Sequence, residues 1–251
     1  MNFTKSDFEK ITRKDGRKYN QLRTVKITTD VVEYAEGSAM VEFGKTRVLC
    51  AASVENKSAP WLIGSGSGWV TAEYGMLPRS THTRIKREKS MTGGRTQEIS
   101  RLIGRSLRAA VDLKAIYEKQ IIIDCDVINA DGGTRTAAIT GGFVALAIAL
   151  NKMKNNKAIA TLPLKSYVSA VSVGLENGIP LLDLNYDEDS KIHTDMNFVI
   201  NAKNEFIEIQ GTAESEPFSE TQLSEMMTIA RLGCQELIAE QKRALNGIIG
   251  L

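Results

Sequence analysis

A glycine-rich turn between a strand-like run and a helix-like run most constrains the fold of this chain. Residues 120–128 are an isoleucine-rich, strand-like run, and residues 137–152 are an apolar, helix-like run. The turn between them carries Asp-Gly-Gly-Thr-Arg-Thr at 131–136. A turn of this kind offers an anion free backbone N–H groups, the positive end of a helix dipole and a guanidinium. The sequence therefore predicts a phosphate-binding turn where a strand leads into a helix.

A second turn of the same kind precedes the clearest predicted helix. It reads Gly94-Arg95-Thr96, and Thr96 is expected to be the N-cap. The apolar residues that then recur at helical spacing are Ile99, Leu102, Ile103, Leu107, Ala110 and Val111. Either turn alone is a weak signal, because many such turns keep glycine for geometry and arginine for a surface ion pair. Two of them beside a basic loop favour phosphate binding.

Basic residues gather between residues 79 and 108, although the net charge of the whole chain is only +2. Nine basic side chains stand against two acidic ones there: Arg79, Arg84, Lys86, Arg87, Lys89, Arg95, Arg101, Arg105 and Arg108 against Glu88 and Glu98. Residues 78–94 are expected to form a long loop. The last three arginines recur at i, i+4 and i+7, which indicates either a solvated helix face or an anionic or acidic partner. A basic stretch of this kind suits a polyanion.

Acidic residues gather later, at Asp183, Asp187, Glu188, Asp189 and Asp195. Asp183 and Asp189 flank a predicted turn that can bring their carboxylates together around Mg²⁺. The alternative is an acidic surface turn without a ligand. The two histidines, His82 and His193, belong to no Ser/His/Asp or Cys/His arrangement. The absence of an obvious protein nucleophile suits a reaction in which a bound substrate attacks.

Length and composition are those of an ordinary globular protein. The chain has 251 residues, of which 42% are hydrophobic and 25% charged. Strand-like patterns occupy 23–29, 38–52, 69–74, 120–128, 166–175, 179–184, 196–200 and 205–210, and helix-like patterns 96–111, 137–152 and 219–245. They predict an α+β fold, a mixed sheet with helices packed on it. No repeat or linker divides the chain, so one domain over residues 1–251 is expected.

The cysteines and the chain start predict a reduced, cytoplasmic protein. Cys50, Cys125 and Cys234 are far apart in apolar surroundings, so they are expected to be buried thiols. The polar first residues lack a signal-peptide core. No apolar run is expected to be long enough to span a membrane, so no membrane partner is expected.

Several motifs resemble, in the same order, those of the ribonuclease PH family. They are GWVTAEYGMLPRST at 68–81, GRTQEI at 94–99, RLIGRSLR at 101–108, DCDVI at 124–128, GGTRT at 132–136, LDLNYDEDS at 182–190, DMN at 195–197 and IQGTAE at 209–214. The likeness runs from about residue 12 to the last helix. GGTRT with the preceding DCDVI is the most specific of these motifs.

The resemblance implies the ribonuclease PH fold, which is related to the second domain of ribosomal protein S5. It implies a phosphorolytic 3′→5′ exoribonuclease that trims the 3′ tails of tRNA precursors and other RNAs. Orthophosphate would be the co-substrate, nucleoside diphosphates the products and Mg²⁺ the cofactor. The family also implies a homohexameric ring built as a trimer of dimers.

The resemblance assigns roles to individual residues. Its phosphate ligands correspond to Arg95, Gly133, Thr134 and Arg135. Its metal-binding and catalytic carboxylates correspond to Asp183 and Asp189. Its positions associated with RNA binding and ring assembly correspond to Arg79, Arg84 and Arg87.

The chain departs from the family pattern in two places. Lys14 replaces the proline of an Arg-Pro-Asp-Gly-Arg motif, and the loop between Arg87 and Gly94 is a little shorter than in relatives. Two other functions remain open: an inactive ring subunit that scaffolds RNA or protein, and a hydrolase that uses a Mg²⁺-bound water. The intact ligand positions argue against the first, and the two arginine-bearing turns argue against the second.

Overall fold

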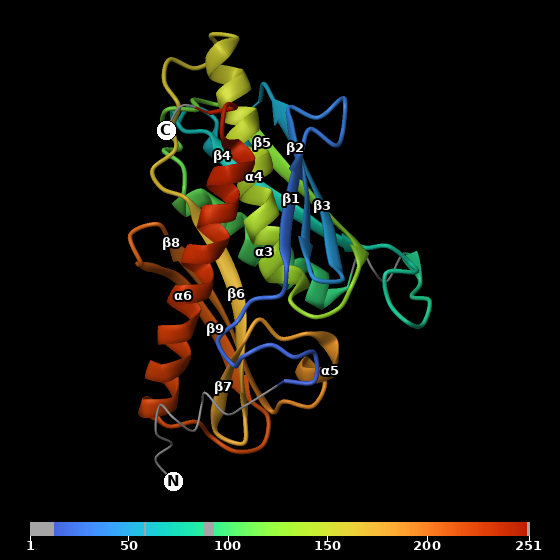
Figure 1. Ribbon diagram of the computed structural model, residues 1–251. Coiled ribbons are helices and arrows are strands. Elements are labelled where there is room, and N and C mark those ends of the chain that lie inside the picture. Colours follow the sequence, from blue (N-terminus) through green and yellow to red (C-terminus); the bar gives the residue numbers. More distant parts are fainter. Residues whose placement is uncertain (1–12, 58, 88–92, 250–251) are drawn as a thin grey trace.

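The strands form two sheets in this computed structural model, which describes residues 13–57, 59–87 and 93–249 (Figure 1). The first sheet has the order β1-β2-β3-β5-β4, and only β4 and β5 run parallel in it. Its strands are β1 (Val25–Thr29), β2 (Gly37–Phe43), β3 (Thr46–Glu55), β4 (Trp69–Met76) and β5 (Gln120–Asn129). The second sheet is antiparallel, with the order β7-β6-β8-β9. Its strands are β6 (Val168–Glu176), β7 (Ile179–Leu182), β8 (Thr194–Asn201) and β9 (Phe206–Ala213).

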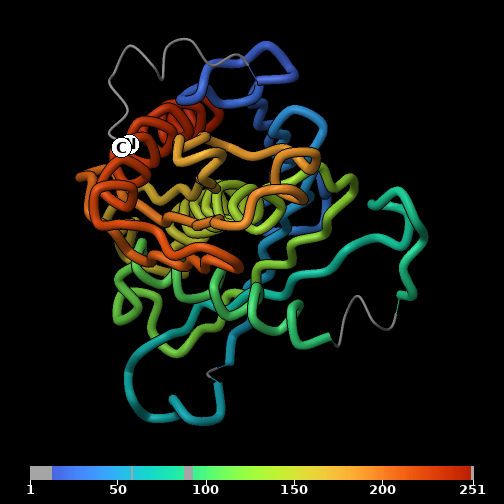
Figure 2. The backbone as a smooth tube through the Cα atoms, turned by 90° about the horizontal axis from the view of Figure 1, so that it is seen from below, coloured from blue at the N-terminus to red at the C-terminus, as the bar shows by residue number. Residues whose placement is uncertain are grey.

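Helix α4 (Thr134–Asn155) lies between the two sheets and contacts β2, β3 and β6. Figure 2 shows it nearly end-on, in the middle of the molecule. Helix α3 (Gly94–Ala109) packs on β4, and the long helix α6 (Glu220–Leu245) packs on β6 and β7. The short elements are η1 (Pro60–Leu62) before β4 and α5 (Tyr186–Asp189) between β7 and β8.

Helix α4 is apolar on every side because it forms the centre of the core. Its glycines allow close packing: a Cβ on Gly141 would lie 2.7 Å from Val41 Cγ1 and 3.0 Å from Cys50 Sγ. Contrary to the expectation from sequence, this helix is long and apolar enough to cross a membrane by length and composition alone. However, 89% of its most apolar window is buried inside the protein. A helix that is covered all round by its own chain is a core helix.

A single hydrophobic cluster joins the two sheets and their helices. It includes the fully buried rings of Phe43 in β2, Phe143 in α4 and Phe198 in β8. The three cysteines are free and buried, as expected. The shared core fixes the start of α4 relative to the second sheet, and the candidate site lies at that junction.

The expected α+β fold, with mixed strand pairing and packed helices, is confirmed. Some boundaries differ. Helix α4 begins at Thr134, three residues before the predicted start. The N-cap of α3 is the extended residue Gly93, so the expectation that Thr96 is the cap was wrong. The acidic turn forms the one-turn helix α5 because Asn185 and Glu188 make a reciprocal capping box.

Candidate active site

The phosphate-binding residues predicted from the two turns meet in one cavity of about 1190 Å³. The cavity lies where the starts of α3 and α4 face α5, β8 and β9. Five predicted site residues line it: Arg95, Gly133, Thr134, Arg135 and Asp189. Other side chains on its wall are His82, Tyr186, Asp195, Gln210 and Glu214. The structure thus brings together both arginine-bearing turns and one of the two predicted carboxylates.

Two long helices begin at this cavity without a capping side chain. The N-caps of α3 and α4 are Gly93 and Gly133, and neither helix start has a side-chain cap hydrogen bond. By contrast, Asn185 and Ser219 cap α5 and α6 with complete capping boxes. The first N–H groups of a helix have no intrahelical partner and lie at the positive end of its dipole. Two uncapped helix starts on one wall are therefore suited to hold an anion.

The glycines of the turn before α4 are required by its geometry. Gly132 and Gly133 have φ values of 76° and 64°, in the left-handed region. A Cβ on Gly132 would also lie 2.4 Å from the carbonyl oxygen of Leu184. These constraints bring the turn against the segment that carries α5.

Arg135 is held in place across the cavity wall. Its Nη1 donates to Gln210 Oε1 on β9 at 2.9 Å and lies 3.6 Å from Glu98 Oε1 on α3. Gln210 Nε2 donates to the same Glu98 oxygen at 2.7 Å. Arg95, in the first turn of α3, is exposed to the cavity. Two guanidiniums from different helices can thus reach one anion.

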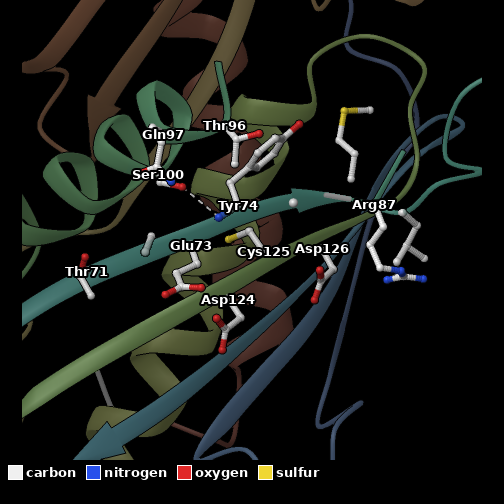
Figure 3. Close-up of a pocket in the computed structure, with 14 residues that line it drawn as sticks. Thr71, Glu73, Tyr74, Arg87, Thr96, Gln97, Ser100, Asp124, Cys125 and Asp126 are labelled. Atoms are coloured by element: carbon white, nitrogen blue, oxygen red, sulfur yellow. Dashed lines mark hydrogen bonds between the residues drawn. The ribbon is translucent and has the colours of Figure 1, made fainter. Parts of the chain in front are cut away.

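Tyr74 is a site residue that the sequence reasoning missed. Its hydroxyl and that of Thr134 are 2.8 Å apart, and its ring is buried. Burial raises the pKa of Tyr74, although the Thr134 hydrogen bond and the charges of Arg95 and Arg135 lower it. In Figure 3 the ring points away from Glu73, toward the start of α3. The available signal was its inward position in β4, since a buried tyrosine usually finds a hydrogen-bond partner.

Four carboxylates line the cavity: Asp189 at the end of α5, Asp195 in β8, Glu214 just after β9, and Glu98 in α3. Glu98 lies beside Arg135, and the pKa is raised for Asp189 and Asp195. Desolvation by the surrounding walls raises the pKa of Asp189, even though the residue is exposed to the cavity, and Asp195 raises it further. Burial likewise raises the pKa of Asp195, Arg135 and Arg95 oppose this rise, and Glu214 adds to it. The sequence analysis places Asp195 in an acidic stretch and in the DMN motif but assigns it no role. Burial and mutual repulsion therefore disfavour the charges of Asp189 and Asp195, and Arg95 and Arg135 offset only part of this effect.

Asp183 does not take the position predicted for it. It is fully buried, and it does not line the cavity. Arg23 encloses its carboxylate, with Nη2 at 2.6 Å from Oδ1 and Nε at 2.9 Å from Oδ2, and Arg17 Nη1 lies 3.5 Å from Oδ2. Burial would raise the pKa of Asp183, but the charge and hydrogen bonds of Arg23 lower it overall. The structure consequently pairs Asp189 with Asp195 at the cavity, and Asp183 with arginine beneath it.

The three predicted RNA-binding arginines are exposed and do not converge on one point. Arg79 lines a neighbouring cavity of about 810 Å³. Arg87 lines another, of about 470 Å³, together with Glu73, Asp124 and Asp126 (Figure 3). Arg84 lines none of these three cavities. The loop between Arg87 and Gly94, expected to be a little shorter than in relatives, lies mostly outside the described residues.

Two arginines, two uncapped helix starts and a carboxylate pair lie around one cavity, an arrangement that suits reactions of phosphate groups. Sequence comparison identifies the family. The profile of the 3′ exoribonuclease family, domain 1, matches residues 21–150, and that of domain 2 matches residues 166–232. The chain therefore belongs to the 3′ exoribonuclease family.

Close relatives carry the name Ribonuclease PH. The protein of that name from Bdellovibrio bacteriovorus is 67% identical over 236 residues, which are 94% of this chain and 97% of the relative. The one from Methylobacterium radiotolerans is 55% identical over 93% of this chain and 99% of the relative. The family expected from the sequence motifs is confirmed.

Solved structures share the fold at low sequence identity. Rice Rrp46 superimposes with a TM-score of 0.75 at 21% identity, covering 93% of this chain and all of that one. The Archaeoglobus fulgidus exosome with RNA bound to the active site gives a TM-score of 0.78 at 20% identity, covering 91% of this chain and 92% of that one. The expected ribonuclease PH fold is confirmed.

The buried pair beneath the cavity gives a stability prediction. In Asp183→Asn the Arg23 guanidinium loses its charged partner in a dry environment, so we expect a loss of about 3–5 kcal/mol in the free energy of unfolding at pH 7. The pKa of Asp183 is lowered in the folded protein, so its contribution is present above the unfolded pKa of about 3.9 and is lost as the pH falls through the folded value. Urea unfolding at neutral and acidic pH measures both effects.

The matched control is Glu208→Gln. Arg105 Nη2 also lies 2.6 Å from its partner Glu208 Oε1, but the arginine side chain is 49% exposed. Solvent screening limits the expected loss to under about 1 kcal/mol. Equal losses for the two variants would contradict the structural role of the buried pair.

Proposed function

We propose that this protein is a phosphorolytic 3′→5′ exoribonuclease that shortens RNA, including the 3′ tails of tRNA precursors, with orthophosphate as co-substrate. The observation that carries the proposal is the convergence of Arg95, Arg135 and two uncapped helix starts on one cavity. A hydrolase needs a bound water and no second anion site. The name of the closely similar relatives also supports phosphorolysis.

In the proposed reaction an orthophosphate oxygen forms a bond to the phosphorus of the last phosphodiester. The bond from that phosphorus to the 3′ oxygen of the shortened RNA breaks, and this oxygen takes up a proton from water. The released nucleotide now carries two phosphates and is a nucleoside diphosphate. Because two anions must approach each other, the protein has to neutralise charge and fix geometry.

The phosphate-binding residues divide this work among them. Arg95 and Arg135 hold orthophosphate by charge-assisted hydrogen bonds. The uncapped backbone at Gly133 and the N–H and hydroxyl of Thr134 orient it. When the Tyr74 hydroxyl donates to Thr134, the Thr134 proton is free to point at the phosphate. Asp183 acts by positioning the turn, since its carboxylate is occupied by Arg23.

Asp189 and Asp195 fit a Mg²⁺ ion. Mg²⁺ commonly binds one or two carboxylates together with substrate phosphates and water. Among the described residues there is no group of three or more His, Cys, Asp or Glu side chains suited to a metal, so the substrate would supply further ligands. When bound, the ion adds positive charge beside the scissile phosphate. The raised pKa values of both carboxylates are consistent with a site built for a cation.

RNA reaches the cavity through phosphate contacts, for which Arg79, Arg84 and Arg87 are the proposed partners. We also propose a homohexamer, a trimer of dimers. On the first sheet, the face opposite α4 carries half-buried apolar side chains such as Leu49, Ala51 and Ile122, which another subunit could cover. Sedimentation velocity tests this assembly, and a monomer at micromolar concentration would contradict it.

A product assay tests the reaction. A 3′-tailed RNA is incubated with Mg²⁺, with and without orthophosphate, and we expect nucleoside diphosphates only when phosphate is present. In Arg135→Ala, removal of one charged donor should lower this rate by about 10²–10³ with the fold intact by circular dichroism. Arg243→Ala is the matched control, because Arg243 is 70% exposed on α6 and pairs with Glu240.

Each other outcome has a defined meaning. Monophosphates formed without phosphate would indicate hydrolysis, and no product would indicate a scaffold subunit. Near-wild-type phosphorolysis by Arg135→Ala would contradict the site assignment.

The carboxylate pair gives a prediction on metal and pH. The pKa of Asp189 is raised in the folded protein, so above that pKa its ionised carboxylate lowers the stability of the fold. This loss of stability is relieved as the pH falls through the pKa and the carboxylate takes up a proton. We expect Asp189→Asn not to lower the melting temperature at pH 8 without metal. Mg²⁺ should raise the melting temperature of the wild type but not of this variant. This Mg²⁺-dependent rise should disappear as the pH is lowered. It should begin to disappear at a pH above about 4, the pKa of an ordinary aspartate.

Thermal unfolding with and without MgCl₂ measures these shifts. Asp187→Asn is the control, because Asp187 lies on the same helix α5 but lines the neighbouring cavity only. It should keep the Mg²⁺-dependent shift. The same shift in Asp189→Asn would place the cation elsewhere.

A further inference from the structure

A pair of aromatic rings stands at the boundary between two cavities. His82 and Tyr186 have ring centroids 5.7 Å apart with an interplanar angle of 51°. Both residues line the 1190 Å³ cavity that holds Arg95 and Arg135, and both line the neighbouring 810 Å³ cavity that holds Arg79. Tyr186 is 49% exposed, so much of its surface is accessible to a ligand. None of the roles derived above uses this ring pair.

The backbone beneath Tyr186 is firmly held, and the contact of its ring with His82 limits the freedom of the side chain. Tyr186 begins α5, whose capping box is formed by Asn185 and Glu188. Glu188 is in turn bound by the buried Arg13, whose Nε donates to Glu188 Oε1 at 2.6 Å. Arg79 Nη1 donates to the carbonyl oxygen of His82 at 3.2 Å, which ties the second ring to a cationic side chain. A rigid aromatic surface loses little entropy when it binds a flat ligand.

The two rings lie beside the cavity in which the proposed reaction at phosphate takes place. Tyr186 and Asp189 are three residues apart in α5, so they share one side of the helix, and both line the larger cavity. Lys191 lines both cavities. A single-stranded nucleic acid that passes from one cavity to the other would therefore bring a base to the rings and its phosphates to lysine and arginine. Proteins bind single strands in this way, with bases on aromatic rings and a basic groove along the backbone.

We propose that Tyr186, supported by His82, is a stacking site for a base near the 3′ end of the RNA. This inference rests on the proposed function, because it assumes that the chain in the cavity is RNA. Stacking uses the face that every base shares, so the site accepts any sequence. It would hold the strand in register while Asp189 and the arginines act on the phosphate beside it.

The test measures RNA binding without turnover. Binding of single-stranded oligoadenylates is followed by fluorescence anisotropy with no orthophosphate present. One RNA is intact, and three others each carry one abasic nucleotide at the first, second or third position from the 3′ end. Wild type is compared with Tyr186→Ala, with Tyr186→Phe, which keeps a ring, and with His82→Ala, which leaves α5 untouched.

We expect Tyr186→Ala to weaken binding of the intact RNA on the order of tenfold, and Tyr186→Phe to bind nearly as tightly as wild type. His82→Ala should show a smaller loss than Tyr186→Ala. The wild type should bind one of the abasic RNAs about tenfold more weakly than the intact RNA. For that abasic RNA, Tyr186→Ala and the wild type should have the same affinity, because the base that stacks on the ring is missing. The KM for orthophosphate in phosphorolysis should be unchanged in Tyr186→Ala.

Equal losses in Tyr186→Phe and Tyr186→Ala would overturn the proposal, because they would show that the ring is not what binds. The proposal would also be overturned if Tyr186→Ala weakened the binding of all three abasic RNAs as much as that of the intact RNA. It would be overturned as well if Tyr186→Ala raised the KM for orthophosphate together with the KM for RNA. A wild-type protein that shows the base-dependent binding but releases no diphosphate would overturn the proposed reaction and leave the stacking site standing. Diphosphate release without any dependence on Tyr186 would overturn the stacking site alone.

Discussion

The buried ion pair between Arg23 and Asp183 holds together the segments that meet at the cavity. Arg23 precedes β1, Asp183 follows β7, and the same guanidinium donates to the carbonyl oxygens of Asp131 and Gly132 in the turn before α4. The Thr46 hydroxyl donates to the Gly132 carbonyl as well, at 2.6 Å. Because this network is dry and the Asp183 carboxylate is fully engaged, moving the turn would leave charged groups unpaired at low dielectric. The geometry of Gly133 and Thr134 thus depends on a contact between residues 160 positions apart.

Sequence reasoning succeeds where the determining interactions are local. The glycines, threonine and arginine of the turn before α4 act within one helical turn, so their spacing alone predicts an anion site. The helix that follows Arg95 is predicted for the same reason, since the helical period of its apolar residues determines it. The placement of β5 between β3 and β4 was not predicted, because strand pairing is a non-local choice.

The parts of the site that escape prediction depend on tertiary contacts. Spacing suggested that Asp183 and Asp189 share a metal, but Asp183 adopts a φ of 53° and its carboxylate is bound by Arg23, while the capped helix α5 separates it from Asp189. Asp195 replaces it at the cavity because β8 pairs beside β6 and β9. Tyr74 joins the site only because the fold brings its hydroxyl within 2.8 Å of Thr134 at the start of α4. These contacts join segments that are distant in the sequence, so no pattern within one segment predicts them.

The cavity is built at some cost to the stability of the protein. Capping side chains are present on α5 and α6 but absent from α3 and α4, whose uncapped starts line the cavity. Asp189 and Asp195 are held where their charges are disfavoured, and Arg95 and Arg135 lie on the same wall. A capping side chain would compete with an anion for the same N–H groups, and a neutral residue at either aspartate would relieve repulsion but leave a cation fewer ligands. Groups that are left unsatisfied in this way favour ligands of opposite charge, so the proposed binding of phosphate and a cation would stabilise the folded protein in proportion to their affinity.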